Sequence, residues 1–467
     1  MRVEMSGRQS RSAASNSAVA PQIRDEEQIY TLRPGIIWSA YRSEHAAFIA
    51  MCIYLFFEYV KPEQQYAIFG ILPFLKLSIF GAMIGFAVDK QSKFSPSTLL
   101  VFFTLFLSHC VVSSVLAYRP DISFSRIDLI YIPLIVFILI TSIVNNERRL
   151  FLFLLVYFVS NLRMSEFGFF SWVRRGFSFA SYGVTGAGWF RNSGELGMQM
   201  AVFFSYTICF VFFLRQYWKG WVKWLMYFLP ISAVGCIVAS SSRGAIIGAV
   251  GSLIYLSIFT KRKFRTWAGV ALLGCFGYLV MPSQFLERFQ TAGKDETSLT
   301  RIYYWEKARE MLDSHPSTGV GYFNWVPYFK DHYFDPDISH RVEEAHNTYL
   351  QIGAELGYPG LILFAAMILI SFWMNWRSEI ICRRPGFEFL RSLALGMNAA
   401  CTALVLSATF LTATYLPSFW VHFGLTVSLR LAIRRKLPPQ ASKTPVWRRT
   451  TGSGVASATK EITPKSK

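Results

Sequence analysis

The chain has 467 residues, of which 53% are hydrophobic, 17% aromatic and only 16% charged. A soluble protein of this length carries more charge and shorter apolar runs. Here apolar runs of roughly 17–25 residues, the length that crosses a bilayer, recur along most of the sequence. The composition therefore predicts an all-α, polytopic membrane protein, and the short alternating segments of a β-barrel are absent.

In chain order, residues 1–44 are rich in Ser, Ala and Arg and lack an apolar core, so we expect a disordered segment without a cleaved signal peptide. The tail 431–467 is basic and polar and is also expected to be disordered. The predicted bundle fills 45–430 with about twelve transmembrane helices. Their predicted ranges are 45–60, 66–88, 97–118, 127–144, 150–172, 195–214, 223–239, 244–260, 264–281, 349–375, 392–410 and 412–430.

The Lys and Arg residues between these spans predict the orientation. Most of them lie in the two terminal segments and in the short loops after every second span. By the positive-inside rule this face is cytoplasmic, so both termini are predicted to be cytoplasmic. The net charge of +19 follows from this bias. A nucleic-acid partner is therefore not expected, whereas membrane lipids are.

A long loop over 282–348 separates predicted spans nine and ten on the opposite, periplasmic face. Within it, LTRIYYWEKAREMLDSHPSTGVG has apolar and aromatic residues at helical spacing, and Pro316 and Gly319 end the pattern. The sequence therefore predicts a large helical loop at the membrane boundary. A simple cap over the spans and a lid over an active site remain equally open interpretations.

Arginine residues occur close to the membrane on this face. Arg243, in SSSRGA, lies between two spans with almost no loop, and an Arg there is costly without a partner or a water-filled cavity. Snorkelling to lipid headgroups is the alternative. Arg191, in RNSGELG, either pairs with Glu195 one helical turn later or faces the same cavity as Arg243.

The stretch HNTYLQIGAELGYPG begins predicted span ten. Histidine exchanges protons near neutral pH, so His346, preceded by Glu343 and Glu344, is a candidate base. A satisfied polar residue at the mouth of the helix is the alternative. Glu355 lies roughly 13 Å deeper along the helix axis and is expected to face the bundle interior. His340 and His346 do not share a helix face, so no metal site is expected.

Together these motifs resemble the bacterial O-antigen ligases, within the wider O-antigen ligase and polymerase superfamily. The motifs that carry the resemblance are His-Asn, nine residues, Gly, two residues, Gly in the stretch above, and RNSGELG, SSSRGA and TRIYYWEKAREMLDSHPSTGVGYFNW. The resemblance covers about residues 185–375. The layout of twelve spans with a large loop between spans nine and ten is similar as well.

The resemblance implies a glycosyltransferase of the bacterial inner membrane that needs neither metal nor cofactor. Such enzymes pass a glycan from undecaprenyl pyrophosphate to an acceptor hydroxyl on the periplasmic face: lipid A–core in the ligases, the growing polysaccharide in the polymerases, and a protein in other relatives. His346 matches the essential His of the family, as the general base. The substrate-binding residues are then expected to be Arg191, Arg243, Arg301 and Asn347, with Glu195 and Glu355 supporting them.

Two alternatives to a ligase remain. A polymerase of O-antigen or exopolysaccharide shares the fold and the loop layout. A secondary transporter, which is a different class, fits twelve spans with intramembrane charges. No repeat relates the two halves of the chain, however, and the charged motifs gather at one face, so the transporter is the weaker hypothesis.

Overall fold

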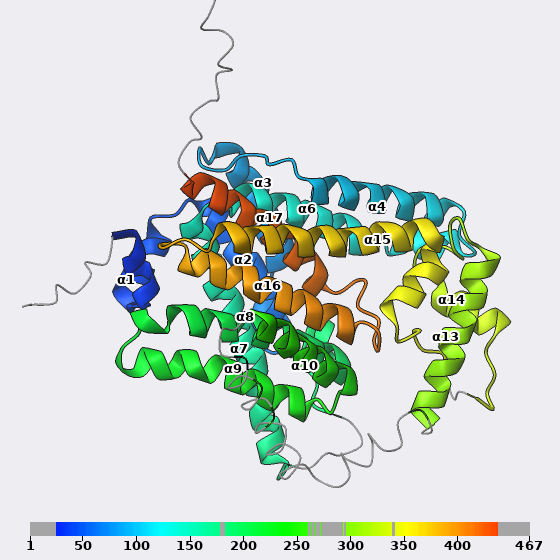
Figure 1. The fold of residues 1–467 in the computed structure, drawn as a ribbon. Coiled ribbons are helices and arrows are strands. Elements are labelled where there is room, and N and C mark those ends of the chain that lie inside the picture. Colours follow the sequence, from blue (N-terminus) through cyan, green and yellow to red (C-terminus); the bar gives the residue numbers. More distant parts are fainter. Residues whose placement is uncertain are drawn as a thin grey trace, which may run out of the picture.

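The computed structural model describes residues 25–177, 183–259, 296–338 and 341–437, together with Lys263, Trp267, Ala271 and Gly293 as single positions. In this part of the chain the regular elements are all helices, which confirms the predicted all-α class. Figure 1 shows long helices running side by side, with α13 (Glu296–Ser314) and α14 (Trp325–His332) gathered at one end of the bundle. We call this end the α13–α14 end.

The bundle helices are α2 (Ala46–Val60), α3 (Phe74–Val88), α4 (Thr98–Val115), α6 (Asp128–Ile143), α7 (Glu147–Arg174), α8 (Ser193–Leu214), α9 (Gly220–Ala239), α10 (Arg243–Ile258), α15 (Thr348–Ile381), α16 (Glu388–Ser407) and α17 (Pro417–Lys436). The shorter elements are η1 (Asp25–Thr31), α1 (Pro34–Arg42), η2 (Pro62–Gln64), η3 (Ala67–Gly70), α5 (Pro120–Ser125), η4 (Gly188–Phe190) and η5 (Arg215–Tyr217).

Among the described residues, 7 helices are long and apolar enough to cross a membrane, or up to 8 if the pair α1 and α2, bent by 118°, is one span. A polytopic helical membrane protein is thus confirmed, whereas the predicted count of twelve is not. The apolar helices α3 and α10, of 15 and 16 residues, are too short to be counted among these spans. Predicted span 264–281 lies outside the described residues, and each other predicted span overlaps a helix.

Helices are present within both terminal segments that were expected to be disordered. The segment expected to be disordered over 1–44 contains η1 and α1, and α17 continues to Lys436. Packing explains the first difference, because Tyr30 is buried, donates to Glu147 at 2.6 Å and accepts the Trp218 indole N–H at 2.9 Å on its carbonyl. Residues 1–24 and 438–467 lie outside the described part.

The predicted helix of the long loop is confirmed as α13, which ends at Ser314, just before Pro316. The chain then turns through Gly319, whose φ of +66° lies in the left-handed region. A Cβ at Gly319 would lie 2.2 Å from the backbone of Glu355, so only glycine allows this close approach to α15. The loop is thereby fixed onto the membrane helix that follows His346.

Polar side chains attach α17 to its neighbours inside the bundle. Residues of α17 at helical spacing each bond to a different position on α8 or α15, as expected where polar groups join membrane helices. The bonded pairs are Ser418–Gln199 at 2.6 Å, Tyr206–His422 at 3.1 Å and Ser371–Thr426 at 2.9 Å. These bonds fix the register of α17, and therefore the position of the segment that precedes it.

At the end of the bundle opposite α13, the buried Arg149 joins separate parts of the chain. Its guanidinium lies 2.7 Å from both Glu44 and Asp89 and is only 1% exposed. It also donates to the carbonyl of Ile143 at 3.2 Å. The start of α7 is thus tied to the α1–α2 junction and to the end of α3.

Replacing Arg149 with Met is expected to destabilise the protein by about 3–5 kcal/mol, because the buried Asp89 loses its cation and Glu44 keeps only the half-exposed Arg148, at 3.4 Å. Replacing the neighbouring Arg148, whose side chain is 50% exposed, is expected to cost less than about 1 kcal/mol. Thermal unfolding of both variants in detergent measures the difference. Equal unfolding midpoints of the two variants would show that the contacts of Arg149 do not stabilise the packing of these segments.

Candidate active site

His346 lies at the start of α15 in an uncommon backbone conformation. Its φ of +51° is in the left-handed region, which costs a non-glycine residue about 1–2 kcal/mol. Asn347 is the N-cap of α15, and its side chain accepts from the backbone N–H groups of Tyr349 and Leu350, both at 3.1 Å. Such strain persists where the surroundings hold it, often at functional sites.

Two tryptophans of the long loop hold the backbone just before His346. The Trp325 indole donates to the carbonyl of Glu343 at 2.9 Å, and the Trp305 indole donates to the carbonyl of Ala345 at 3.0 Å. Both residues belong to the long loop that the sequence predicts at the membrane boundary. Their contacts favour support of the site over a simple cap.

The imidazole of His346 contacts Glu343, with Nε2 3.1 Å from Oε2. An ionised carboxylate can only accept, so Nε2 carries the hydrogen in this contact and Nδ1 is left to accept a proton. The hydrogen bond from His346 lowers the pKa of Glu343, and the nearby charge of Arg341 acts in the same direction. Glu343 is therefore an ionised group that orients the ring.

Glu344 has the opposite environment. Burial raises the pKa of this carboxyl above its ordinary value, and the charge of Glu343 adds to the rise. Glu344 also interacts electrostatically with Glu195 and Glu355. Four carboxyl groups therefore surround the start of α15.

Replacing Glu344 with Gln is expected to raise stability at pH 8 but not near pH 4. The folded-state pKa is raised, so the wild-type protein loses stability as the pH rises above the unfolded-state value of about 4.3. Glutamine cannot ionise and avoids this loss. Thermal unfolding of the wild type and of Glu344→Gln across this pH range measures the difference in stability. Glu306→Gln, at an exposed position, is the control. A constant difference in unfolding midpoint at every pH would contradict the prediction.

Glu355 is 3% exposed and faces the interior of the bundle. Its Oε1 accepts from the backbone N–H of Trp325 and from the Gln351 amide, both at 3.3 Å, and its Oε2 accepts a short hydrogen bond from the Tyr415 hydroxyl. Three donors compensate the burial of one carboxylate. Glu355 is thus a buried acceptor beneath the His346 loop.

Arg243 is the first residue of α10. The preceding Ser242 caps the helix by accepting from Ala245 N–H at 3.3 Å, and Ser241 has a left-handed φ of +54°. The Arg243 guanidinium donates to the Ser298 hydroxyl of α13 at 3.3 Å. Arg301 follows Ser298 by about one helical turn on α13, so it lies on the same side of that helix.

Arg191 and Glu195 lie on either side of the N-cap of α8. Glu195 accepts from Asn192 N–H at 3.2 Å and completes a capping box with the Asn192 side chain. Arg191 instead donates to Gln64 at 3.4 Å. No ion pair of the described residues joins Arg191 to Glu195, so the pairing left open by the sequence is not formed.

A further cation, Lys61, lies beside this segment and was not identified from the sequence. It is 9% exposed, has a left-handed φ of +50° and pairs with Glu58 at 3.2 Å. Its ammonium lies 5.7 Å from the ring centre of Trp189, whose indole donates to Glu58 at 2.8 Å. In the sequence Lys61 is one of many cations at span ends, and only burial distinguishes it.

Three helix N-termini meet around the segment 408–412. Thr348 at the start of α15 donates to the carbonyls of Ala408 at 2.9 Å and Leu411 at 2.7 Å. A Cβ on Gly244 of α10 would lie 3.0 Å from Phe410, and one on Gly194 of α8 would lie 3.9 Å from Leu411. Each helix N-terminus carries a partial positive charge, so this convergence favours an anion.

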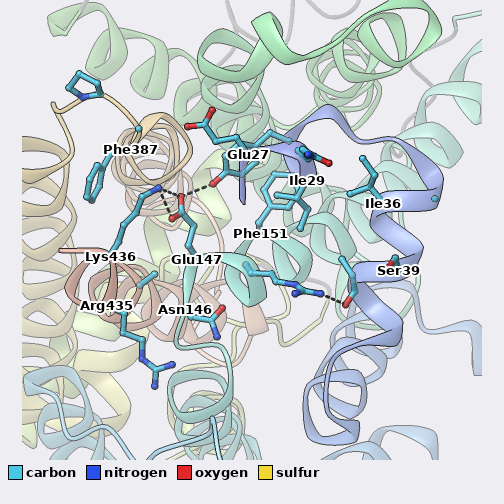
Figure 2. Close-up of a pocket in the computed structure, with 18 residues that line it drawn as sticks. Glu27, Ile29, Ile36, Ser39, Asn146, Glu147, Phe151, Phe387, Arg435 and Lys436 are labelled. Carbon is cyan, nitrogen blue, oxygen red and sulfur yellow. Dashed lines mark hydrogen bonds and ion pairs between the residues drawn. The ribbon is translucent and has the colours of Figure 1, made fainter. Parts of the chain in front are cut away.

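Two cavities lie away from this convergence. One of about 1020 Å³ is lined by η1, α1, the start of α7 and the end of α17. Figure 2 shows Lys436 and Glu147 paired at its wall, near Phe387. It lies beyond the end of α15 opposite His346, and α15 has a kink at Gly357. A second cavity, of about 210 Å³, lies between Trp189 and Tyr415.

The sequence-predicted residues therefore form two groups. His346, Asn347, Arg243 and Glu195 lie at the helix N-termini that meet at the segment 408–412, Glu355 lies deeper and contacts Tyr415, and Arg301 follows Ser298, the partner of Arg243, on α13. Arg191 lies just before the same α8 terminus but is directed to Gln64. Within the described residues, no three His, Cys, Asp or Glu side chains come together as metal ligands.

The family model described as O-Antigen ligase matches residues 228–365, a range that contains Arg243, Arg301, His346 and Glu355. The exopolysaccharide production protein ExoQ of Rhizobium meliloti is 24% identical over 266 residues, which cover 52% of this chain and 58% of ExoQ.

An O-antigen ligase of Pseudomonas aeruginosa is 26% identical over 149 residues, which cover 31% of this chain and 33% of that ligase. The chain thus spans little more than half of one relative and a third of the other. Both matches agree with the family model in the kind of protein that they indicate. The matching domain and these two relatives support the resemblance of the chain to the O-antigen ligase-like superfamily.

Proposed function

We propose that this protein is a ligase that transfers a glycan from undecaprenyl pyrophosphate to an acceptor hydroxyl of lipid A–core, or of a related glycan or protein. The observation that carries the proposal is the meeting of three helix N-termini, one of which begins with Arg243 while another is preceded by the strained His346. This arrangement provides positive charge for a diphosphate and a base for a hydroxyl within one site.

The donor half of the site is cationic. When the bond between the sugar carbon and the phosphate oxygen breaks, negative charge develops on the leaving diphosphate. Arg243 and Arg191 have planar guanidinium groups suited to phosphate oxygens, with Arg301 and Lys61 adjacent to them. The partial charges of the helix N-termini act in the same direction. Preorganised charge of this kind stabilises the transition state without a metal ion.

The acceptor half of the site contains His346. Its Nδ1 accepts the proton of the attacking hydroxyl while the hydroxyl oxygen forms the new bond to the sugar carbon. Glu343, on Nε2, orients the ring and stabilises the positive charge that it gains. The proton then leaves to solvent and the diphosphate departs with its bridging oxygen. Asn347 contributes by capping α15 and so fixing the position of His346.

The proposal includes a location. The basic loops and both termini face the cytoplasm, so the α13–α14 end faces the periplasm of a bacterium with the chain in its inner membrane. A lipid-linked glycan reaches that end from within the bilayer. Membrane lipids are therefore the surrounding partners, and the site needs no cofactor.

A polymerase is the second candidate function. It is favoured by one observation, because the relative named for exopolysaccharide production matches more of this chain than the O-antigen ligase does. A polymerase would use the same cationic half for the donor diphosphate. Its acceptor would be the end of another lipid-linked glycan.

Deleting the coding sequence and profiling the lipid-linked glycans tests the proposal. A ligase predicts accumulation of long lipid-linked chains with an unmodified acceptor, restored by the wild-type protein but not by His346→Ala. Single accumulated repeats would replace the ligase with the polymerase. A normal glycan profile with loss of uptake of a solute would contradict both and support the transporter.

A further inference from the structure

A buried chain of hydrogen bonds runs from Tyr415 to the backbone beside His346. Tyr415 donates to Glu355, and Glu355 accepts from the Gln351 amide at 3.3 Å. The side-chain oxygen Oε1 of Gln351 accepts from Ala345 N–H at 3.2 Å. Gln351, at 2% exposure, thus joins the buried carboxylate to the residue before the candidate base.

Gln351 fits this position for a chemical reason. Its oxygen accepts two hydrogen bonds, from Ala345 N–H and from the Thr412 hydroxyl at 2.7 Å, while its NH2 group donates to Glu355. Among the uncharged side chains that match its size, only an amide offers both an acceptor and a donor. A leucine would leave Ala345 N–H and Glu355 without these partners in a buried site.

Of the side chains that hold residues 343–345, Gln351 has a distinct role. Trp305 and Trp325 bind the carbonyls of this segment, whereas Gln351 binds an N–H group. Of these three side chains, Gln351 is also the one that bonds both to Glu355 and to Thr412. Trp305 binds the carbonyl of the peptide plane directly before His346, and Gln351 binds the N–H of the plane one residue earlier, so the two side chains together fix both planes that lead into the left-handed φ of His346.

We propose that Gln351 is a positioning residue for His346, through which Glu355 and Tyr415 fix the orientation of the base. The proposal rests on the transfer reaction proposed above. Tyr415 also lines the 210 Å³ cavity, so the far end of the chain lies at a wall that a bound molecule can touch. In this role Gln351 acts through the chain of hydrogen bonds and does not need to contact either substrate.

The experiment measures kcat and KM for glycan transfer by the full-length protein in detergent or liposomes. Gln351→Leu is expected to lower kcat about 10–100-fold while KM for the lipid-linked donor changes less than about 2-fold, since a small misplacement of a reacting group has an effect of this size. Gln351→Glu, which places a second carboxylate beside Glu355, is expected to lower kcat similarly. Gln216→Leu, the same change at an exposed site in η5, is the matched control and keeps the wild-type kcat.

The double variant Gln351→Glu with Glu355→Gln separates positioning from general loss of structure. It exchanges the amide and the carboxylate and keeps every hydrogen bond of the chain except the one from Trp325 N–H. We expect it to recover at least about 5-fold of the kcat lost by Gln351→Glu alone. This comparison remains informative if Gln351→Leu fails to fold.

Three outcomes decide the proposal. A wild-type kcat in Gln351→Leu overturns it, and so does a double variant no more active than Gln351→Glu. A rise in KM without a fall in kcat also overturns it, because Gln351 would then act in binding. Absence of transfer by the wild-type protein instead overturns the proposed function and is seen before any variant is compared.

Discussion

Replacing His346 with Ala is expected to abolish glycan transfer while the protein still inserts into the membrane in normal amount. The substitution removes the atom that accepts the hydroxyl proton, and general base catalysis contributes about 10²–10⁴-fold to a rate. It also releases Glu343 from its 3.1 Å contact. The measurement is glycan transfer by membranes that contain equal amounts of wild-type and variant protein.

The control is His332→Ala, the same substitution at an exposed histidine of α14. His332 stacks on Tyr328 at 4.1 Å and is part of the same external region, but it has no contact with the His346 loop in the described residues. It is expected to retain nearly full transfer. Retained transfer by His346→Ala would remove His346 from the mechanism, and equal loss in both variants would indicate damage to the fold.

The pH dependence of transfer adds an independent check on the base. A neutral imidazole is required, so the rate is expected to fall as the pH is lowered through the region where histidine becomes protonated. The carboxylate of Glu343, whose pKa is lowered by His346, stays ionised over this range. Because burial raises the pKa of the neighbouring Glu344, the profile is also measured in Glu344→Gln, where an unchanged acid limb reports on His346. A rate that is flat from pH 5 to 8 would contradict this role.

The parts of the fold that depend on local pattern were predictable from the sequence. Apolar runs gave the helical membrane class, and the aromatic and apolar spacing in the long loop gave α13 with its end before Pro316. The number of spans was less predictable, because α3 and α10 are apolar but short. Tyr30 shows why the N-terminal boundary failed, since its burial depends on Glu147 and Trp218, which are distant in sequence.

The candidate site was predictable only as individual residues. His346 and Arg243 stand out because ionisable groups at span ends are costly, and the capping box at Asn192 and Glu195 can be identified by its spacing alone. The partners of these residues cannot be identified in this way. Lys61 and Gln351 carry no distinctive local pattern, and their roles depend on contacts with Trp189, Ala345 and other residues brought close by the fold.

Arg243→Ala is expected to lower kcat for transfer about 10²–10³-fold, the effect of removing one preorganised group that stabilises developing charge. The loss corresponds to about 2.7–4 kcal/mol of transition-state stabilisation. Arg243→Lys keeps the charge but not the planar pair of donors. Its activity is therefore expected to lie between that of the wild type and that of Arg243→Ala. Kinetics with purified lipid-linked glycan measure all three proteins.

The matched control for Arg243 is Arg309→Ala, at an exposed position of α13. Both substitutions remove one positive charge from the α13–α14 end, so a long-range effect of net charge would lower both rates and would weaken at high salt. If Arg243 contacts the diphosphate directly, the rate falls only in the Arg243 variant. The size of this fall then depends little on the salt concentration. A rate in Arg243→Ala equal to that of the wild type would leave Arg243 as a structural link from α10 to Ser298. The cationic half of the site would then have to be formed by Arg191, Arg301 and Lys61 around the same helix N-termini.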